Sequence, residues 1–202
     1  MRLSSIIVSL LLATAASASP IELDRVAAAL AGSEAQFTQR FTPKGFKNSQ
    51  NESGSVIFGT LPMMRWSYVK PEQKTFVFDG SQSWFYIPAD RQVTTARIDE
   101  SRKKELPFLL LGDPVARDKA FTIDEKKSGS TFVTTLQSRD LRSAIRSVVI
   151  TSSAATHQIA RVEYSDREGN RTSFELTGYH PRSTPAETFR FSAPAGVQVV
   201  TQ

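Results

Sequence analysis

The stretch Met63–Pro88 constrains the fold of this chain more than any other part of its sequence. Three short runs within it alternate apolar and polar residues, which is the pattern of half-buried β-strands. Asp79-Gly80 separates the second run from the third and is a strong signal for a tight hairpin. Each run carries two aromatic residues that share one face of the strand: Trp66 and Tyr68, Phe76 and Phe78, and Trp84 and Tyr86. If the three strands pair in a suitable register, these six rings form one apolar surface.

Such a surface has two interpretations, an ordinary sheet core or the wall of a cavity for a lipid. The periodicity of the sequence does not distinguish between them.

Alternating runs continue through the rest of the chain and are separated by turn residues. About eleven short strands follow one another by hairpins, which predicts a mainly β protein with one large antiparallel sheet, rolled or closed. Outside the aromatic stretch, the expected strands lie at Phe37–Phe41, Ser55–Thr60, Arg91–Ile98, Phe121–Asp124, Thr131–Leu136, Ala144–Ile150, Ile159–Tyr164, Thr172–Leu176 and Phe189–Phe191.

Two segments read as helices instead. In Ile21–Gly32, apolar residues recur at helical spacing and a glycine ends the run. Leu106–Leu111 is a short apolar segment in the middle of the β-rich sequence, and Gly112 follows it. The second segment is either a mobile apolar helix or a helix fixed in the core.

The first 18 residues are typical of a secretory signal peptide. Arg2 provides a short charged region, Leu3–Ala13 is apolar, and Ala16-Ser17-Ala18 is a small-residue cleavage site. We therefore expect cleavage after Ala18, a single domain over residues 19–202 and, in a bacterium, a periplasmic location. The chain has no cysteine, so neither a disulfide nor a lipid attached to an N-terminal cysteine is expected.

The formal net charge of +5 is mild, and the basic residues are scattered. With no accompanying binding motif, this charge does not predict nucleic-acid binding.

No pattern in the sequence predicts an enzyme. His157 and His180 have no partner at metal-ligand spacing, and neither a nucleophile elbow nor a phosphate-binding loop occurs. We therefore expect no catalytic residues, no metal site and no cofactor.

The aromatic stretch resembles the family of outer-membrane lipoprotein carriers, LolA. The resemblance is carried by Leu61–Glu72, by the Asp79-Gly80 turn, by Ser83–Pro88 and by Gln92-Val93. It extends to an early Phe-Thr-Gln-Arg-Phe, to the apolar helix in mid-chain and to the closing Phe-x-Phe-x-x-Pro-x-Gly-Val, and so covers nearly all of the chain after residue 18.

The resemblance implies an incomplete antiparallel barrel whose helices form a lid over an apolar cavity. The six aromatic residues named above would line the cavity, and the lid would consist of Leu106, Phe108, Leu109, Leu110 and Leu111. Met63 and Met64 would contact partner proteins. Many relatives carry an arginine that helps to hold the lid closed, and here Leu61 occupies that position.

The function implied is that of a monomeric periplasmic carrier for lipid-modified proteins. It would take their acyl chains from an inner-membrane lipoprotein-releasing transporter and pass them to an outer-membrane lipoprotein receptor. The alternative on the same fold is a protein that binds or senses a different lipid or hydrophobic product.

Overall fold

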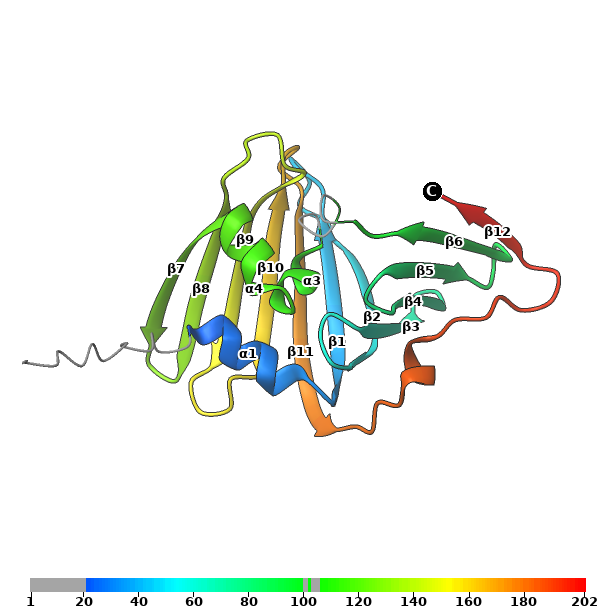
Figure 1. The fold of residues 1–202 in the computed structure, drawn as a ribbon. Coiled ribbons are helices and arrows are strands. Elements are labelled where there is room, and N and C mark those ends of the chain that lie inside the picture. The colour runs from blue at the N-terminus through cyan, green and yellow to red at the C-terminus, as the bar shows by residue number, and fades with distance from the viewer. Residues whose placement is uncertain (1–20, 100–101, 103–105) are drawn as a thin grey trace, which may run out of the picture.

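The computed structural model describes residues 21–99, 102 and 106–202, and the predicted signal peptide lies outside these residues. Within them, one twelve-stranded sheet with the order β12-β6-β5-β4-β3-β2-β1-β11-β10-β9-β8-β7 dominates the fold (Figure 1). The strands are β1 Ser33–Thr42, β2 Gln50–Phe58, β3 Met64–Lys70, β4 Lys74–Phe78, β5 Gln82–Ile87, β6 Gln92–Arg97, β7 Phe121–Ser128, β8 Thr131–Ser138, β9 Ile145–Ser153, β10 Ile159–Asp166, β11 Arg171–Pro181 and β12 Gln198–Thr201.

The sheet is open, because β12 forms one edge and β7 forms the other. Among the described strands, every pairing is antiparallel except that of β12 with β6. The predicted class, a mainly β protein with an incomplete antiparallel barrel, is therefore confirmed. The described part of the sheet contains twelve strands, where the sequence predicted about eleven.

Three of the described helices lie against one face of the sheet, which we call the inner face (Figure 1). They are α1 Glu22–Leu30, α3 Pro107–Leu111 and α4 Pro114–Ala120. The main hydrophobic core lies between these helices and the inner face, and it includes residues from both halves of the sheet.

Helix α1 is amphipathic, as its sequence predicts. Leu23, Val26 and Leu30 are fully buried on the side that faces the sheet. At the start of the helix, the backbone N–H groups of Glu22 and Leu23 donate to the Glu125 carboxylate of β7 over 3.0 and 3.2 Å. A carboxylate at this position accepts hydrogen bonds from N–H groups that have no partner within the helix. Its negative charge also interacts favourably with the positive end of the helix dipole.

The predicted hairpin between β4 and β5 is present. Gly80 has a φ of +106°, which a residue without a side chain adopts readily. The Asp79 side chain fixes the turn by accepting from the N–H groups of Ser81 and Gln82, both at 2.8 Å. Gly80 and Ser81 form a two-residue loop, and this loop sets the register of the two strands.

The last predicted strand is wrong. Residues 186–189 form the 3₁₀ helix η1 (Ala186–Phe189), in which Phe189 is only 1% exposed. The chain crosses the outer face here, since Arg65 Nη1 of β3 donates to the Thr188 carbonyl over 3.4 Å. The alternation of Phe189 and Phe191 resembles a strand, but these residues do not pair with the sheet. Their rings pack against its outer face instead, and the ring centroids of Phe191 and Tyr86 lie 5.6 Å apart. The final strand is β12, further along the chain.

Candidate functional site

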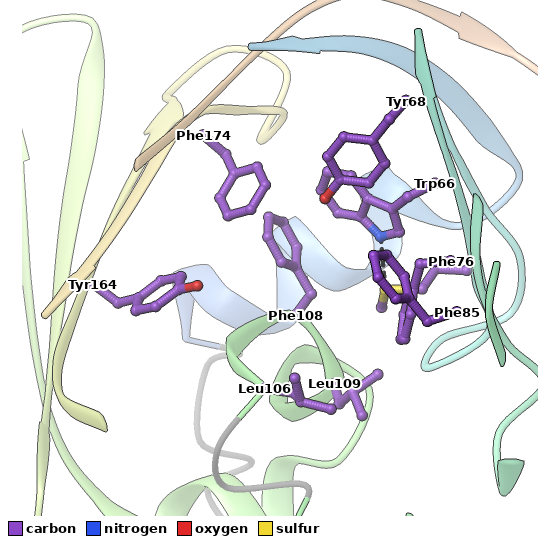
Figure 2. A pocket seen from close by; sticks show the side chains of 10 residues that line it. Trp66, Tyr68, Phe76, Phe85, Leu106, Phe108, Leu109, Tyr164 and Phe174 are labelled. Atoms are coloured by element: carbon purple, nitrogen blue, oxygen red, sulfur yellow. Dashed lines mark hydrogen bonds between the residues drawn. The ribbon is translucent and has the colours of Figure 1, made fainter. Parts of the chain in front are cut away.

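An apolar pocket of about 200 Å³ lies on the inner face between the two halves of the sheet (Figure 2). Among the residues that the structure describes, no charged side chain lines its wall. The lining residues are Met64, Trp66, Tyr68, Phe76, Phe85, Leu106, Phe108, Leu109, Tyr164 and Phe174. Ligand pockets usually enclose about 300–1,000 Å³, so this one is small in the form described here.

Helix α3 reduces the size of the pocket because it inserts Phe108 between the walls. The Phe108 ring lies edge-on to Trp66 at 4.9 Å and to Phe174 at 5.4 Å, measured between ring centroids. Figure 2 shows the Phe108 ring between Trp66 on one wall and Phe174 on the other. The side chain is 8% exposed. The ring therefore fills space that would otherwise be open to a ligand.

The indole of Trp66 has an internal partner for its polar N–H group. Nε1 donates to the sulfur of Met64 over 3.1 Å, so the ring is buried without an unpaired donor. Met64 is itself 2% exposed. The expected Met63–Met64 contact surface is therefore wrong at Met64, whose side chain belongs to the core. Met63 is half-buried beside Gly59 and Gly80.

The register of the strands divides the six predicted aromatic residues between two faces. Trp66 pairs with Phe76 on the inner face, and Tyr68 also lines the pocket. Phe78 has the same orientation as Phe76 but is fully buried in the main core and does not line the pocket, so the prediction that it lines the cavity is wrong.

Trp84 and Tyr86 lie on the outer face, so the prediction that they line the cavity is wrong. The two-residue turn places Phe85 opposite Phe76, and Trp84 opposite Val77. Because side chains alternate along a strand, Phe85 faces the pocket and its two neighbours face away.

Sequence reasoning also missed Phe174 and Tyr164, which line the opposite wall. They lie on β11 and β10, far from the aromatic stretch in sequence. The alternation in these strands was visible, but the pairing of β1 with β11, which brings them to the pocket, was not.

The predicted lid segment is buried in this structure. Leu109, Leu110 and Leu111 are each no more than 2% exposed, and Leu106 is half-buried. Helix α3 thus belongs to the core and at the same time lines the pocket.

The end of α3 packs directly on the backbone at Leu61. A Cβ atom on Gly112 would lie 2.8 Å from the Leu61 carbonyl carbon and 2.8 Å from the Pro62 nitrogen. These distances are too short for a side chain. The close approach therefore depends on glycine at position 112.

A buried arginine joins α4 to α1. Arg117 is 1% exposed, and its Nη2 lies 3.0 Å from the Asp24 carboxylate of α1. Its Nε lies 3.0 Å from Asp118. Within the described part of the chain, its Nη1 has no hydrogen-bond partner. The pair of Arg117 and Asp24 connects the two helices that flank α3.

Two phenols point into the pocket from opposite walls. Figure 2 shows the hydroxyl groups of Tyr68 and Tyr164 directed toward the space between the walls. Burial raises the pKa of both phenols above the usual value, and the Glu52 carboxylate adds to the shift at Tyr68. Both side chains are therefore uncharged hydrogen-bonding groups at neutral pH.

Ser152, His157 and Glu22 meet beneath α1, but their arrangement is not that of a catalytic triad. Ser152 Oγ donates to Glu22 Oε1 over 2.7 Å, and His157 Nδ1 lies 3.1 Å from both carboxylate oxygens. In a Ser-His-acid triad the serine hydroxyl donates a hydrogen bond to the histidine, whereas here the Ser152 hydroxyl donates to the Glu22 carboxylate. The cluster holds α1 to β9 and the β9–β10 turn.

Within residues 21–99, 102 and 106–202, no group of three or more acidic or histidine side chains could hold a metal ion. Among the helices described, none has the length and apolarity needed to cross a membrane.

Two features define the class of this protein. One curved sheet wraps around the helices of its inner face, and the described lining of the pocket between them is aromatic and uncharged. The family profile described as outer membrane lipoprotein carrier protein LolA matches residues 28–192. The chain therefore belongs to the LolA family, which consists of carriers and not of enzymes.

Individual relatives agree with this assignment. The chain is 28% identical over 204 residues to the outer-membrane lipoprotein carrier protein of Xanthomonas oryzae pv. oryzae, covering 99% of this chain and 96% of that protein. It is 30% identical over 175 residues to the protein of the same name from Aliivibrio salmonicida, covering 85% and 84%.

Among solved structures, an uncharacterized conserved protein from Thermus thermophilus has the same fold. The TM-score is 0.56 at 15% identity, with 90% of this chain and 97% of that chain covered.

Proposed function

We propose that this protein is a periplasmic carrier that binds the acyl chains of lipoproteins in the pocket of the inner face. It receives them from an inner-membrane lipoprotein-releasing transporter and delivers them to an outer-membrane receptor. The observation that carries the proposal is the pocket lining, which is uncharged and largely aromatic. Acyl chains need adaptable apolar surface, and aromatic and methionine side chains provide it.

Helix α3 acts as the lid in this proposal. One acyl chain of about 16 carbons gains on the order of 10 kcal/mol when it is fully buried. Three such chains would exceed the practical limit of about 18–21 kcal/mol for a non-covalent complex, and the cargo could not be released. A helix that fills the pocket when it is empty competes with the cargo and reduces the net affinity. The insertion of Phe108 between the walls supports this role.

The first test is native mass spectrometry of the protein purified from the periplasm without detergent. A triacylated lipoprotein bound to the protein is the expected result. A free lipid or another hydrophobic molecule would instead support the alternative, a different ligand on the same fold.

Two neighbouring residues provide a matched pair of variants. Phe85→Glu places a charge in the pocket wall, whereas Trp84→Glu places the same charge on the outer face of the same strand. We expect the first variant to lose lipoprotein binding and the second to retain it. Equal binding by both folded variants would contradict the assignment of the pocket.

A further inference from the structure

A cluster of polar side chains adjoins the apolar pocket on the inner face, and the proposed carrier function does not use it. Gln39 of β1 pairs in register with Glu52 of β2, and Tyr68 of β3 pairs with Lys74 of β4. Residues directly opposite each other on neighbouring strands share a face. Between β2 and β3, Tyr68 lies opposite Gly54, which is two residues from Glu52 and therefore on the same face. The four side chains thus form a row on the inner face that is displaced by two residues between β2 and β3. Tyr68 belongs both to this row and to the pocket wall.

The members of the row contact one another. The Tyr68 hydroxyl donates to Gln39 Oε1 over 2.9 Å, and the amide nitrogen of Gln39 carries two further N–H donors. Lys74 pairs closely with Glu52, and its Nζ lies 5.7 Å from the centroid of the Tyr68 ring. The Lys74 and Glu52 side chains are 18% and 21% exposed, so a ligand can reach them although they are largely buried.

The charges of this row cancel. Glu52 neutralises Lys74, Gln39 is an amide, and the phenols of Tyr68 and Tyr164 are uncharged. The site therefore offers hydrogen bonds without net charge, next to an apolar wall. A ligand group that carries a charge would lose its hydration here without gaining an opposite charge, which is costly.

We propose that this row binds the uncharged polar head of the lipid while its chain lies in the aromatic pocket. The Gln39 amide and the Lys74 ammonium donate hydrogen bonds to the ester or amide carbonyls of the head, beside Tyr68 and Glu52. Glu52 determines the specificity, because its pairing with Lys74 excludes anionic heads such as carboxylates. This inference rests on the proposed lipid-binding function.

The test compares two ligands with the same 16-carbon chain, monopalmitoylglycerol and palmitate. The chain has two tryptophans, so in a Trp84→Phe background Trp66 reports from within the pocket by its fluorescence. The protein is purified after export, and the affinities for both ligands are measured at pH 8. The parent should bind monopalmitoylglycerol more tightly than palmitate.

Glu52→Gln frees the Lys74 ammonium and should strengthen palmitate binding about tenfold, the effect of one new ion pair in a partly buried site. Gln39→Leu keeps the charges and should weaken monopalmitoylglycerol binding severalfold, with less effect on palmitate. The control is Glu175→Gln, since Glu175 forms a comparable cross-strand ion pair with Arg161 at 2.8 Å on the outer face. It should leave both affinities unchanged.

Two results would overturn the inference and leave the carrier function intact. These are a preference of the parent for palmitate, and a folded Glu52→Gln variant in which the ratio of the two affinities does not change. Failure of the folded parent to bind either ligand would instead reject the lipid-binding function itself, and this inference with it.

Discussion

The ring of Phe108 stands edge-on to the indole of Trp66, with the ring centroids 4.9 Å apart and the planes inclined by 66°. Phe37 meets the same indole at 4.9 Å and 68°. Trp66 is thus held between a strand residue and a helix residue. The contact with Phe37 belongs to the sheet. The contact with Phe108 depends on the position of α3, and so does the size of the pocket.

Phe108→Ala should therefore have opposite effects on folding and on binding. Removing a buried aromatic ring should lower the free energy of unfolding by about 3 kcal/mol. The same change opens the pocket and removes a competitor of the ligand, so the affinity for a lipid should rise about tenfold. Urea unfolding and Trp66 fluorescence titration measure the two quantities.

Phe189→Ala is the control, because Phe189 is 1% exposed but lies at the outer face in η1. It should lose a similar amount of stability without any gain in affinity. If Phe108→Ala binds lipid less tightly than the wild type, Phe108 is part of the binding surface and does not compete with the ligand.

Gly112→Ala should displace α3. The added Cβ would lie 2.8 Å from backbone atoms of Leu61 and Pro62, which cannot rotate away, and Gly112 has an ordinary φ of −86°. We expect a loss of about 1–3 kcal/mol in the free energy of unfolding, caused by overpacking alone.

Gly129→Ala separates this effect from backbone strain. Gly129 has a φ of +58°, and a Cβ atom at this position would have no other atom within 4 Å, so the cost of about 1 kcal/mol arises from the backbone conformation. The Gly112 variant should also bind lipid differently from the wild type, whereas the Gly129 variant should not. Unchanged stability in Gly112→Ala would show that the Leu61 contact is easily relieved.

The buried ion pair between Arg117 and Asp24 predicts which of two variants loses more stability. Asp24→Asn leaves a buried guanidinium with Asp118 as its remaining carboxylate, so it should cost about 2 kcal/mol. Arg117→Met removes the buried charge, and Asp24, whose side chain is 36% exposed, can be hydrated. Arg117→Met should therefore destabilise the protein less than Asp24→Asn. Thermal unfolding of both variants at pH 7 tests this order, and the reverse order would contradict it.

Stability should fall at alkaline pH because of the buried tyrosines. Burial raises the pKa of Tyr68, Tyr164 and Tyr179 in the folded state above the value of about 10 expected in the unfolded chain. Below about pH 10 both states keep these phenols protonated, and the full stability is present. As the pH rises further, the unfolded state loses protons first, so stability falls by up to about 1.4 kcal/mol per pH unit for each tyrosine until the folded-state pKa is reached.

Urea unfolding between pH 8 and pH 11 measures this slope. Tyr179→Phe and Tyr68→Phe should each flatten it, although Tyr179 also loses the hydrogen bond from its hydroxyl to the Ile159 carbonyl at 3.0 Å. Phe76→Leu, which removes no titrating group, should lower stability equally across the range. A slope that is identical in the wild type and in both tyrosine variants would refute the prediction.

Much of the fold was predictable because its signals are local. The alternation of residues in Met63–Pro88 predicted three neighbouring strands, and the Asp79-Gly80 pair predicted their hairpin. The helical spacing of Leu23, Val26 and Leu30 predicted α1. In each of these cases, residues close in sequence determine the backbone conformation.

The pocket was only partly predictable. Trp66, Tyr68 and Phe76 were expected on it, and all three line it. Trp84 was assigned to the wrong face, because a hairpin with two loop residues shifts the partner of Phe76 to Phe85. A shift of one residue in register reverses the face of every side chain, and alternation in a single strand does not contain that information.

The sequence by itself thus determined the strands, the hairpin, the apolar helix of mid-chain and the family. Only the tertiary structure decided which rings face the pocket, that Phe174 and Tyr164 complete it, and that Gln39, Glu52, Tyr68 and Lys74 form one row beside it. The reason is physical: the conformation of a strand depends on its own residues, whereas a site on a curved sheet depends on the register between strands and on pairings, such as that of β1 with β11, that join distant parts of the chain.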